Sequence, residues 1–227
     1  MNEKDYKEIL AKLTLDEKIT MLSGSTNWLT QPVKRDDIDI PAVRMSDGPS
    51  GLRREKVGGG VNIMQTPEPA TCFPGAVTTA SSWDEKLVEE VGQAIAVEAQ
   101  SLGVSTVLGP GVNIKRGPLC GRNFEYFSED GCLSGELAAS YVKGVQKNGT
   151  SATVKHFCCN NQDNYRMSGD SVVSEKELFD TYLKQFYKVI KTASPDCVMT
   201  SYNKINGEKS NESCFLQKEV LRNKIRV

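Results

Sequence analysis

Residues 152–167 read ATVKHFCCNNQDNYRM, and the first half of this stretch decides the fold class. Ala152–Cys159 is a short and mostly apolar run, which is typical of a buried strand. Amphipathic helices are predicted on both sides of it, at residues 134–147 and from Ser174 onward. A strand between two helices indicates a parallel sheet whose strands are joined by crossover helices.

The same alternation extends outward from this strand in both directions. The other predicted elements are helices at residues 3–13, 14–24 and about 83–102, and β-like runs at Ile40–Val43, Val104–Ile114 and Cys197–Ser201. An open doubly wound sheet and a (β/α)₈ barrel both fit this order of elements. In either fold, chemistry takes place just beyond the carboxyl ends of the strands.

Three predicted helix starts show the capping-box pattern, in which a hydroxyl residue precedes a glutamate by three positions. The pairs are Thr14 with Glu17, Ser82 with Glu85, and Ser174 with Glu177. These pairs place the first turns of the corresponding helices.

Composition describes an ordinary globular protein. The 227 residues include 28 Lys and Arg against 29 Asp and Glu, with 38% hydrophobic and 25% charged residues. A balance this close to neutral gives no electrostatic reason to expect binding to nucleic acid or to an anionic membrane. The hydrophobic fraction is too high for a disordered chain.

Location and redox state are predicted from the N-terminus and the cysteines. The sequence opens MNEKDYKEILAKL, which has no apolar segment or cleavage site of a signal peptide. No stretch reaches the ~20 apolar residues that span a bilayer. The seven cysteines are odd in number and contain no CxxC pair, which argues against a disulfide framework and a zinc site. We therefore predict reduced thiols and a cytoplasmic location.

Lys155 and His156 stand out because they end an otherwise apolar strand, and His156 is the only histidine in the chain. A cation and an imidazole at a buried strand end cost desolvation energy unless they have partners. A dense group of polar residues follows: Asn160, Asn161, Gln162, Asp163, Asn164 and Arg166. This hydrogen-bonding capacity suits a hydroxyl-rich ligand, but a lone histidine is explained equally well as a structural group.

Three further polar segments follow other predicted strands, at residues 44–53, 121–130 and 199–207. Taken singly, each has a plain structural explanation. The first is a loop with a helix-capping aspartate, the second a packed loop whose charges pair with each other, and the third an Asn206–Gly207 turn.

Other site classes lack their motifs. The chain has no GxxxxGK phosphate loop and no GxSxG nucleophile elbow, and Gly109–x–Gly111 lacks the third glycine of a dinucleotide fingerprint. One histidine and cysteines without ligand spacing argue against a transition-metal site. We predict neither a metal nor a cofactor.

Taken together, several segments resemble the N-terminal domain of glycoside hydrolase family 3, on its β-glucosidase branch. In chain order they are LTLDEKITMLSG, RMSDGPSGLR, CFPGAVTTASSWDEKL, GPGVNIKRGPLCGRNFEYFSED, ATVKHFCCNNQDNYRM and VMTSYNKING. They follow the family's order with compatible spacing and cover nearly the whole chain. The N-acetylglucosaminidase branch fits less well, because its KHFPGHG-type segment is replaced by KHFCCNNQ.

The resemblance implies a fold and an activity. The fold is an N-terminal (β/α)₈ TIM-type barrel, followed in the family by an α/β sandwich domain. Residues 1–227 would be an incomplete barrel domain, without the second domain. The activity is hydrolysis of terminal, non-reducing β-D-glucosyl residues, with retention, from β-linked glucosides or oligosaccharides. A homo-oligomer is possible for the full-length enzyme.

The resemblance also assigns roles at the subsite for the terminal sugar. Asp47 would accept hydrogen bonds from sugar hydroxyls, and Arg53 would steady that carboxylate. Arg122, Lys155 and His156 would grip ring hydroxyls. Charged partners give the stronger hydrogen bonds to hydroxyls.

Two further residues would lie near the catalytic nucleophile of the family. Arg166 would help to keep that nucleophile ionised, and Tyr202 would contact it or the face of the sugar.

The resemblance places both catalytic carboxylates outside this chain. The nucleophile of the family is an aspartate in an SDW-like strand end, expected beyond Val227, and the acid/base glutamate comes from the second domain. A retaining glycosidase needs both. We therefore expect no measurable glycosidase activity from this chain alone, and an exposed apolar barrel edge.

Two interpretations of the chain stay open. It is either a truncated product of a retaining β-glucosidase gene, or a non-catalytic carbohydrate-binding remnant or subunit that a partner chain completes. The sequence that follows Val227 distinguishes them. An unrelated α/β binding domain would require all of the motif matches to be accidental.

Overall fold

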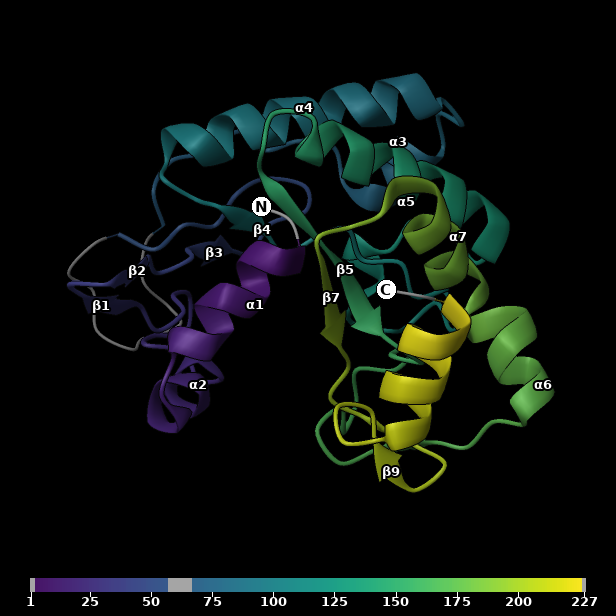
Figure 1. Cartoon of the computed structure of the whole chain (residues 1–227). Helices are drawn as coiled ribbons and strands as arrows, with labels where there is room; N and C mark the ends of the chain where they lie inside the picture. Colours follow the sequence, from purple (N-terminus) through teal and green to yellow (C-terminus); the bar gives the residue numbers. More distant parts are fainter. Residues whose placement is uncertain (1–2, 57–66, 226–227) are drawn as a thin grey trace.

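The computed structural model describes residues 3–56 and 67–225, and a four-stranded parallel sheet lies at its centre (Figure 1). The strands are β3 (Met45–Ser46), β4 (Thr106–Val107), β5 (Ser151–Phe157) and β7 (Cys197–Thr200). They lie side by side in the order of the chain, without the reversal of a doubly wound sheet. The predicted parallel sheet is confirmed, and it forms an open arc of a (β/α)₈-type barrel.

Three long helices connect these strands. They are α4 (Glu85–Ser101), α5 (Gly131–Gln146) and α7 (Lys184–Ala193). Helix α5 packs between α4 and α7, as Figure 1 shows. Their fully buried side chains include Val88, Ile95, Leu137 and Phe186, which join the strands in the main hydrophobic core. The predicted crossover helices are therefore present.

The remaining elements, apart from α1 and η3, are short. They are α1 (Glu3–Lys12), α2 (Leu15–Met21), β1 (Val33–Arg35), β2 (Ile38–Ile40), α3 (Ala76–Ala80), a 3₁₀ turn η1 (Asn123–Glu125), β6 (Asp170–Ser171), α6 (Glu175–Glu177), β8 (Lys204–Ile205), β9 (Glu208–Lys209) and two π-helical segments, η2 (Leu178–Tyr182) and η3 (Phe215–Ile225). A second, smaller core of Leu13, Val33 and Ile38 joins α1 to the β1–β2 hairpin.

Two of the three predicted capping boxes are confirmed, at Thr14 with Glu17 and at Ser174 with Glu177. The prediction for Ser82 with Glu85 is wrong. Asp84 caps α4 instead, because its carboxylate accepts from the backbone N–H groups of Lys86 and Leu87, both at 3.0 Å. One side chain thereby satisfies two free amides of the first turn.

The strand predicted over Val104–Ile114 is regular only at β4. Pro110 has no N–H to donate, and the segment around it pairs with β5 in an irregular way. The backbone N–H groups of Thr153 and Lys155 donate to the carbonyls of Gly109 and Pro110, both at 3.0 Å. The backbone N–H of Val112 donates to the carbonyl of Lys155 at 2.7 Å. The segment therefore pairs with β5 at the carboxyl end of the sheet without forming one continuous strand.

Other boundaries also differ from the predictions. The strand before Asp47 is β3, whereas the predicted run Ile40–Val43 contains only the end of β2, since Pro41 follows it. The helix predicted from Ser174 is interrupted at η2, where the backbone N–H of Leu183 reaches the carbonyl of Leu178. The helix predicted to extend to Gly24 ends at Met21.

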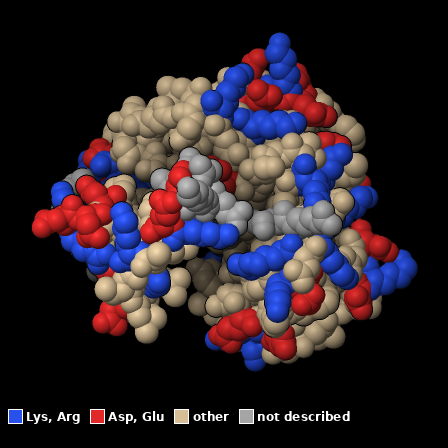
Figure 2. Space-filling view, viewed as in Figure 1, with Lys and Arg blue, Asp and Glu red and all other residues tan. Residues whose placement is uncertain are grey.

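The surface carries both signs of charge. On the face drawn in Figure 2, lysine and arginine side chains are interspersed with aspartate and glutamate. Within residues 3–56 and 67–225, none of the helices is both long enough and apolar enough to cross a membrane.

Candidate functional site

Polar side chains meet at the carboxyl ends of β3 and β5. Asp47 directly follows β3, and Lys155 and His156 lie in the last three residues of β5. Arg122 and Glu125 come from the loop after β4, at the η1 turn. The carboxyl ends of parallel strands share one edge of the sheet, so residues far apart in sequence come into contact there.

Lys155 lies at the centre of this group, and only 2% of its side chain is exposed. Its Nζ is 3.0 Å from Oε2 of Glu125 and 3.4 Å from Oδ1 of Asp47. The two carboxylates differ in their exposure to solvent, since 2% of the Glu125 side chain and 41% of the Asp47 side chain are accessible. Glu125 therefore acts as the buried counter-ion, and Asp47 presents a carboxylate to solvent or a ligand.

Arg122 is the second cation of the group. Its guanidinium forms an ion pair with Glu125, and Nη2 lies 3.0 Å from Nε2 of His156. Burial disfavours the charge of Arg122, but the neighbouring Glu125 carboxylate and Tyr126 raise its pKa above the ordinary value. Glu125 thus joins the two cations that the sequence predicted at a sugar site.

His156 is neutral in this environment. Burial lowers its pKa to about 2, and the positive charges of Lys155, Arg122 and Arg166 act in the same direction. The second ring nitrogen, Nδ1, lies 3.0 Å from the hydroxyl of Tyr126. The imidazole is therefore held between a guanidinium and a phenol.

Buried polar residues form hydrogen bonds with the groups around His156. The Asn160 amide donates to the Tyr126 hydroxyl at 3.0 Å, and the Asn113 amide donates to the backbone carbonyl of His156 at 3.0 Å. Oδ1 of Asn113 accepts in turn from the backbone N–H of Asn160 at 3.2 Å. These contacts satisfy polar groups that would otherwise be costly to bury.

Arg166 and Tyr202 form a neighbouring pair. The guanidinium of Arg166 lies over the Tyr202 ring, 5.9 Å from its centroid, and Nη1 is 3.1 Å from Oδ1 of Asp163. More than half of the Tyr202 side chain is exposed. Arg53 is exposed, and its backbone N–H donates to the Asp47 carbonyl at 2.9 Å.

The structure therefore gathers four predicted residues, Asp47, Arg122, Lys155 and His156, in one connected group. It places Arg166 with Tyr202 beside that group, within electrostatic reach of His156. Arg53 is adjacent to Asp47 through the backbone.

Sequence reasoning missed the buried partners Glu125, Tyr126 and Asn113, and it expected Asn160 to face a ligand, whereas its amide donates to the Tyr126 hydroxyl. A signal for Glu125 was present, since it follows Arg122 by three positions in a segment whose charges were expected to pair with each other. The expectation that charges of that segment pair with each other is confirmed by the Arg122–Glu125 pair, and Glu125 also contacts Lys155 outside the segment.

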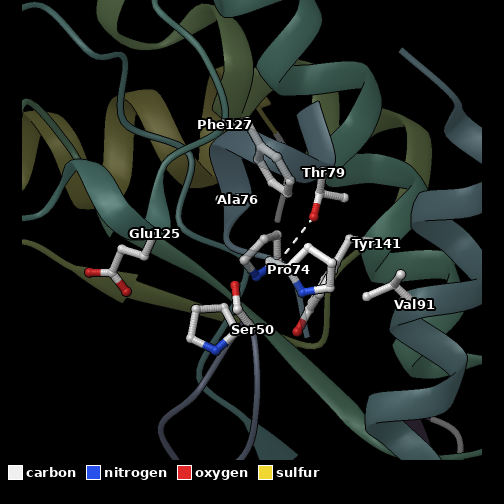
Figure 3. A pocket seen from close by; sticks show the side chains of 10 residues that line it. Ser50, Pro74, Ala76, Thr79, Val91, Glu125, Phe127 and Tyr141 are labelled. Atoms are coloured by element: carbon white, nitrogen blue, oxygen red, sulfur yellow. Dashed lines mark hydrogen bonds between the residues drawn. The ribbon is translucent and has the colours of Figure 1, made fainter. Parts of the chain in front are cut away.

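A small cavity lies behind Glu125 (Figure 3). It is lined mainly by apolar groups, including Val91, Phe127 and Tyr141. The carboxylate of Glu125 points away from the other lining residues, and the Tyr141 hydroxyl is buried without a hydrogen-bond partner among the described residues. The Glu125 carboxylate therefore points out of this cavity.

A cation site is not evident in the part of the chain that the structure describes. Within residues 3–56 and 67–225, His, Cys, Asp and Glu do not form a group of three that could hold a metal ion.

Comparison with known proteins places these residues in a family. The model of the glycosyl hydrolase family 3 N-terminal domain matches residues 8–226. The thermostable beta-glucosidase B of Acetivibrio thermocellus is 50% identical over 219 residues, which are 96% of this chain and 29% of that protein. A beta-glucosidase of Kluyveromyces marxianus is 43% identical over 222 residues, 98% of this chain and 25% of that protein.

Solved structures agree with this match. Beta-glucosidase 3B of Thermotoga neapolitana, in complex with α-D-glucose, superposes with a TM-score of 0.90 at 40% identity, over 98% of this chain and 32% of that one. The Kluyveromyces marxianus beta-glucosidase in complex with glucose gives 0.88 at 43% identity, over 95% and 25%. This chain spans about a quarter to a third of the length of these relatives. It belongs to glycosyl hydrolase family 3 and corresponds to the N-terminal domain of that family.

Proposed function

We propose that this chain holds the terminal sugar of a β-glucoside, as part of a retaining β-glucosidase that acts on non-reducing β-D-glucosyl residues. The observation that carries this proposal is the Lys155 ammonium between the buried carboxylate of Glu125 and the partly exposed carboxylate of Asp47. Two of the similar solved proteins are described as complexes with glucose, which supports glucose as the kind of ligand.

The chemistry of the group suits hydroxyl recognition. Asp47 offers acceptor oxygens, and Lys155 has three N–H donors, of which its two carboxylate partners use two. Arg122, which shares the Glu125 carboxylate with Lys155, contributes further charged donors. Sugar hydroxyls both donate and accept, so an arrangement of neighbouring fixed charges binds them with direction.

The remaining predicted residues take supporting roles in this proposal. Arg53 steadies the Asp47 segment, while His156 acts on ring hydroxyls through Arg122, because both of its ring nitrogens already have partners. Arg166 and Tyr202 would contact a catalytic carboxylate or the face of the sugar. The cation–π contact between Arg166 and Tyr202 keeps that pair together before any ligand arrives.

We further propose that the group binds sugar without cleaving it. Retention requires two carboxyl groups about 5–5.5 Å apart, with the anomeric carbon between them. Here the ammonium of Lys155 contacts both Asp47 and Glu125. Glu125 is also paired with Arg122 and almost fully buried, so it cannot reach a glycosidic bond. Binding by a non-catalytic subunit that a partner chain completes is the alternative use of the same geometry.

Calorimetric titration with glucose tests the proposal. Binding should be weakened about 10- to 100-fold by Asp47→Asn, because a charged acceptor contributes ~1.5–3 kcal/mol to a hydrogen bond. The substitution leaves the shape of a partly exposed side chain unchanged, so the fold should survive it. Asp39→Asn, at an exposed position of β2, is the matched control and should bind like the original chain. Equal affinity in the original chain and Asp47→Asn would reject the assignment.

A further inference from the structure

The contact between Arg122 and His156 indicates where the imidazole proton resides. A guanidinium has N–H donors and no acceptor, so Nε2 of His156, at 3.0 Å from Nη2, must accept. A neutral imidazole carries one proton, which is therefore on Nδ1. The buried Nδ1–H then needs an acceptor of its own.

Tyr126 supplies that acceptor. Its hydroxyl oxygen lies 3.0 Å from Nδ1, and Tyr126 is fully buried. Burial raises the pKa of Tyr126, so the phenol stays neutral. The Asn160 amide donates to the phenol oxygen at 3.0 Å, and the Asn113 amide donates to the backbone carbonyl of His156. The phenol and the imidazole are therefore fixed relative to each other.

The tautomer of His156 also affects the orientation of the Arg122 guanidinium. The contacts described for its guanidinium use Nε and Nη2, toward Glu125 and His156. These contacts orient the plane of the guanidinium and leave Nη1 for a partner outside the group. In the Nε2–H tautomer, the ring N–H would point at the N–H of Nη2. The two donors would repel each other, and the guanidinium would turn away.

We propose that Tyr126 is a positioning residue, which locks His156 in the Nδ1–H tautomer and thereby orients Arg122 toward the ligand. This inference rests on the proposed sugar site for its purpose, but the tautomer itself can be measured without any sugar. The groups that face His156 are the cations Lys155, Arg122 and Arg166 together with Tyr126 and its neighbour Glu125. Protonation of the imidazole beside three cations is unfavourable, so the tautomer should persist from pH 5.5 to pH 8.

Long-range ¹H–¹⁵N correlation spectra of the ¹⁵N-histidine-labelled 227-residue chain provide the test. His156 is the only histidine, so its two ring nitrogens give the only imidazole signals. We expect the Nδ1–H pattern, unchanged from pH 5.5 to pH 8. An Nε2–H pattern, or a ring that titrates in this interval, would overturn the proposal.

Two perturbations test the role of Tyr126. Tyr126→Phe removes the acceptor and should abolish the Nδ1–H pattern. Tyr141→Phe is the matched control, since that hydroxyl is also buried but has no partner among the described residues, and it should leave the pattern unchanged. Retention of the Nδ1–H pattern in Tyr126→Phe would refute the lock.

Labelling with 3-fluorotyrosine keeps the inference testable where Tyr126→Phe does not fold. Fluorine weakens the phenol oxygen as an acceptor with little change of shape, so the Nδ1 proton resonance should move upfield. An unmoved resonance would overturn the role of Tyr126. Glucose titration of the same samples separates the two proposals. A chain with the expected tautomer and no glucose binding rejects the sugar site alone, and a chain that binds glucose through an Nε2–H histidine rejects the lock alone.

Discussion

Glu125 shows how much one buried carboxylate determines at the scale of a single residue. It forms ion pairs with both Lys155 and Arg122, and only 2% of its side chain is exposed. Burying a charge is unfavourable unless it is paired and hydrogen-bonded. Here one anion between two cations keeps both donors at the sheet edge, where the partly exposed Asp47 completes the charge balance.

Replacement of Glu125 by glutamine should therefore lower stability strongly. Glu125→Gln leaves the buried Lys155 and the partly buried Arg122 without their shared counter-ion, and loss of one partner of a buried pair typically costs about 3–5 kcal/mol. Urea unfolding followed by circular dichroism measures the change in the free energy of unfolding.

Glu129→Gln is the matched control for this change. Glu129 is exposed and lies four positions along the same loop, so its substitution should alter the free energy of unfolding by at most about 0.5 kcal/mol. Similar stabilities of the two variants would show that Glu125 is not the counter-ion of the group.

At the scale of elements, two helices approach closely because glycines face each other. A methyl group on Gly144 of α5 would come within 2.1 Å of the Glu89 carbonyl oxygen of α4. One on Gly92 of α4 would come within 2.6 Å of the Tyr141 carbonyl oxygen. This contact fixes the position of α5, which leads directly into β5 and hence into Lys155 and His156.

Gly144→Ala should destabilise the chain even though alanine is the better helix former. The gain in helix propensity is about 1 kcal/mol, whereas the methyl group must displace backbone, and overpacking of this kind costs about 1–3 kcal/mol. The expected net effect is a lower midpoint of urea unfolding. Gly117→Ala is the comparison, because its methyl group meets no atom within 4 Å. A Gly144→Ala midpoint equal to or above that of Gly117→Ala would contradict this packing.

Elements specified by nearby residues were predicted well, and those that depend on distant partners were not. The capping boxes at Thr14 and Ser174 need only four consecutive residues, and both form. The box at Ser82 failed because Asp84, two positions later, offers a carboxylate that satisfies two amides. The strand around Pro110 could not be delimited from its own residues, because β5 decides which of its carbonyl groups are paired.

At the scale of the whole molecule, the parallel order of the strands brings the site together. Lys155 contacts Asp47 across 108 positions of sequence, because β3, β4 and β5 are neighbours that end at the same edge. Sequence predicted that polar residues would gather at this edge. It could not predict that Glu125 would be the buried partner of Lys155, since that pairing depends on where the loop after β4 folds back.

The position of a bound sugar is the central claim, and His156 reports on it directly. Its imidazole contacts Arg122, which contacts Glu125 beside Lys155. The measurement is the chemical shift of the His156 ring during titration of the chain with glucose. We predict a chemical-shift change that saturates with glucose. Asp47→Asn should raise the glucose concentration needed for saturation, and Asp39→Asn should leave that concentration unchanged. A ring signal that stays unmoved while glucose binds would place the sugar elsewhere and contradict the account.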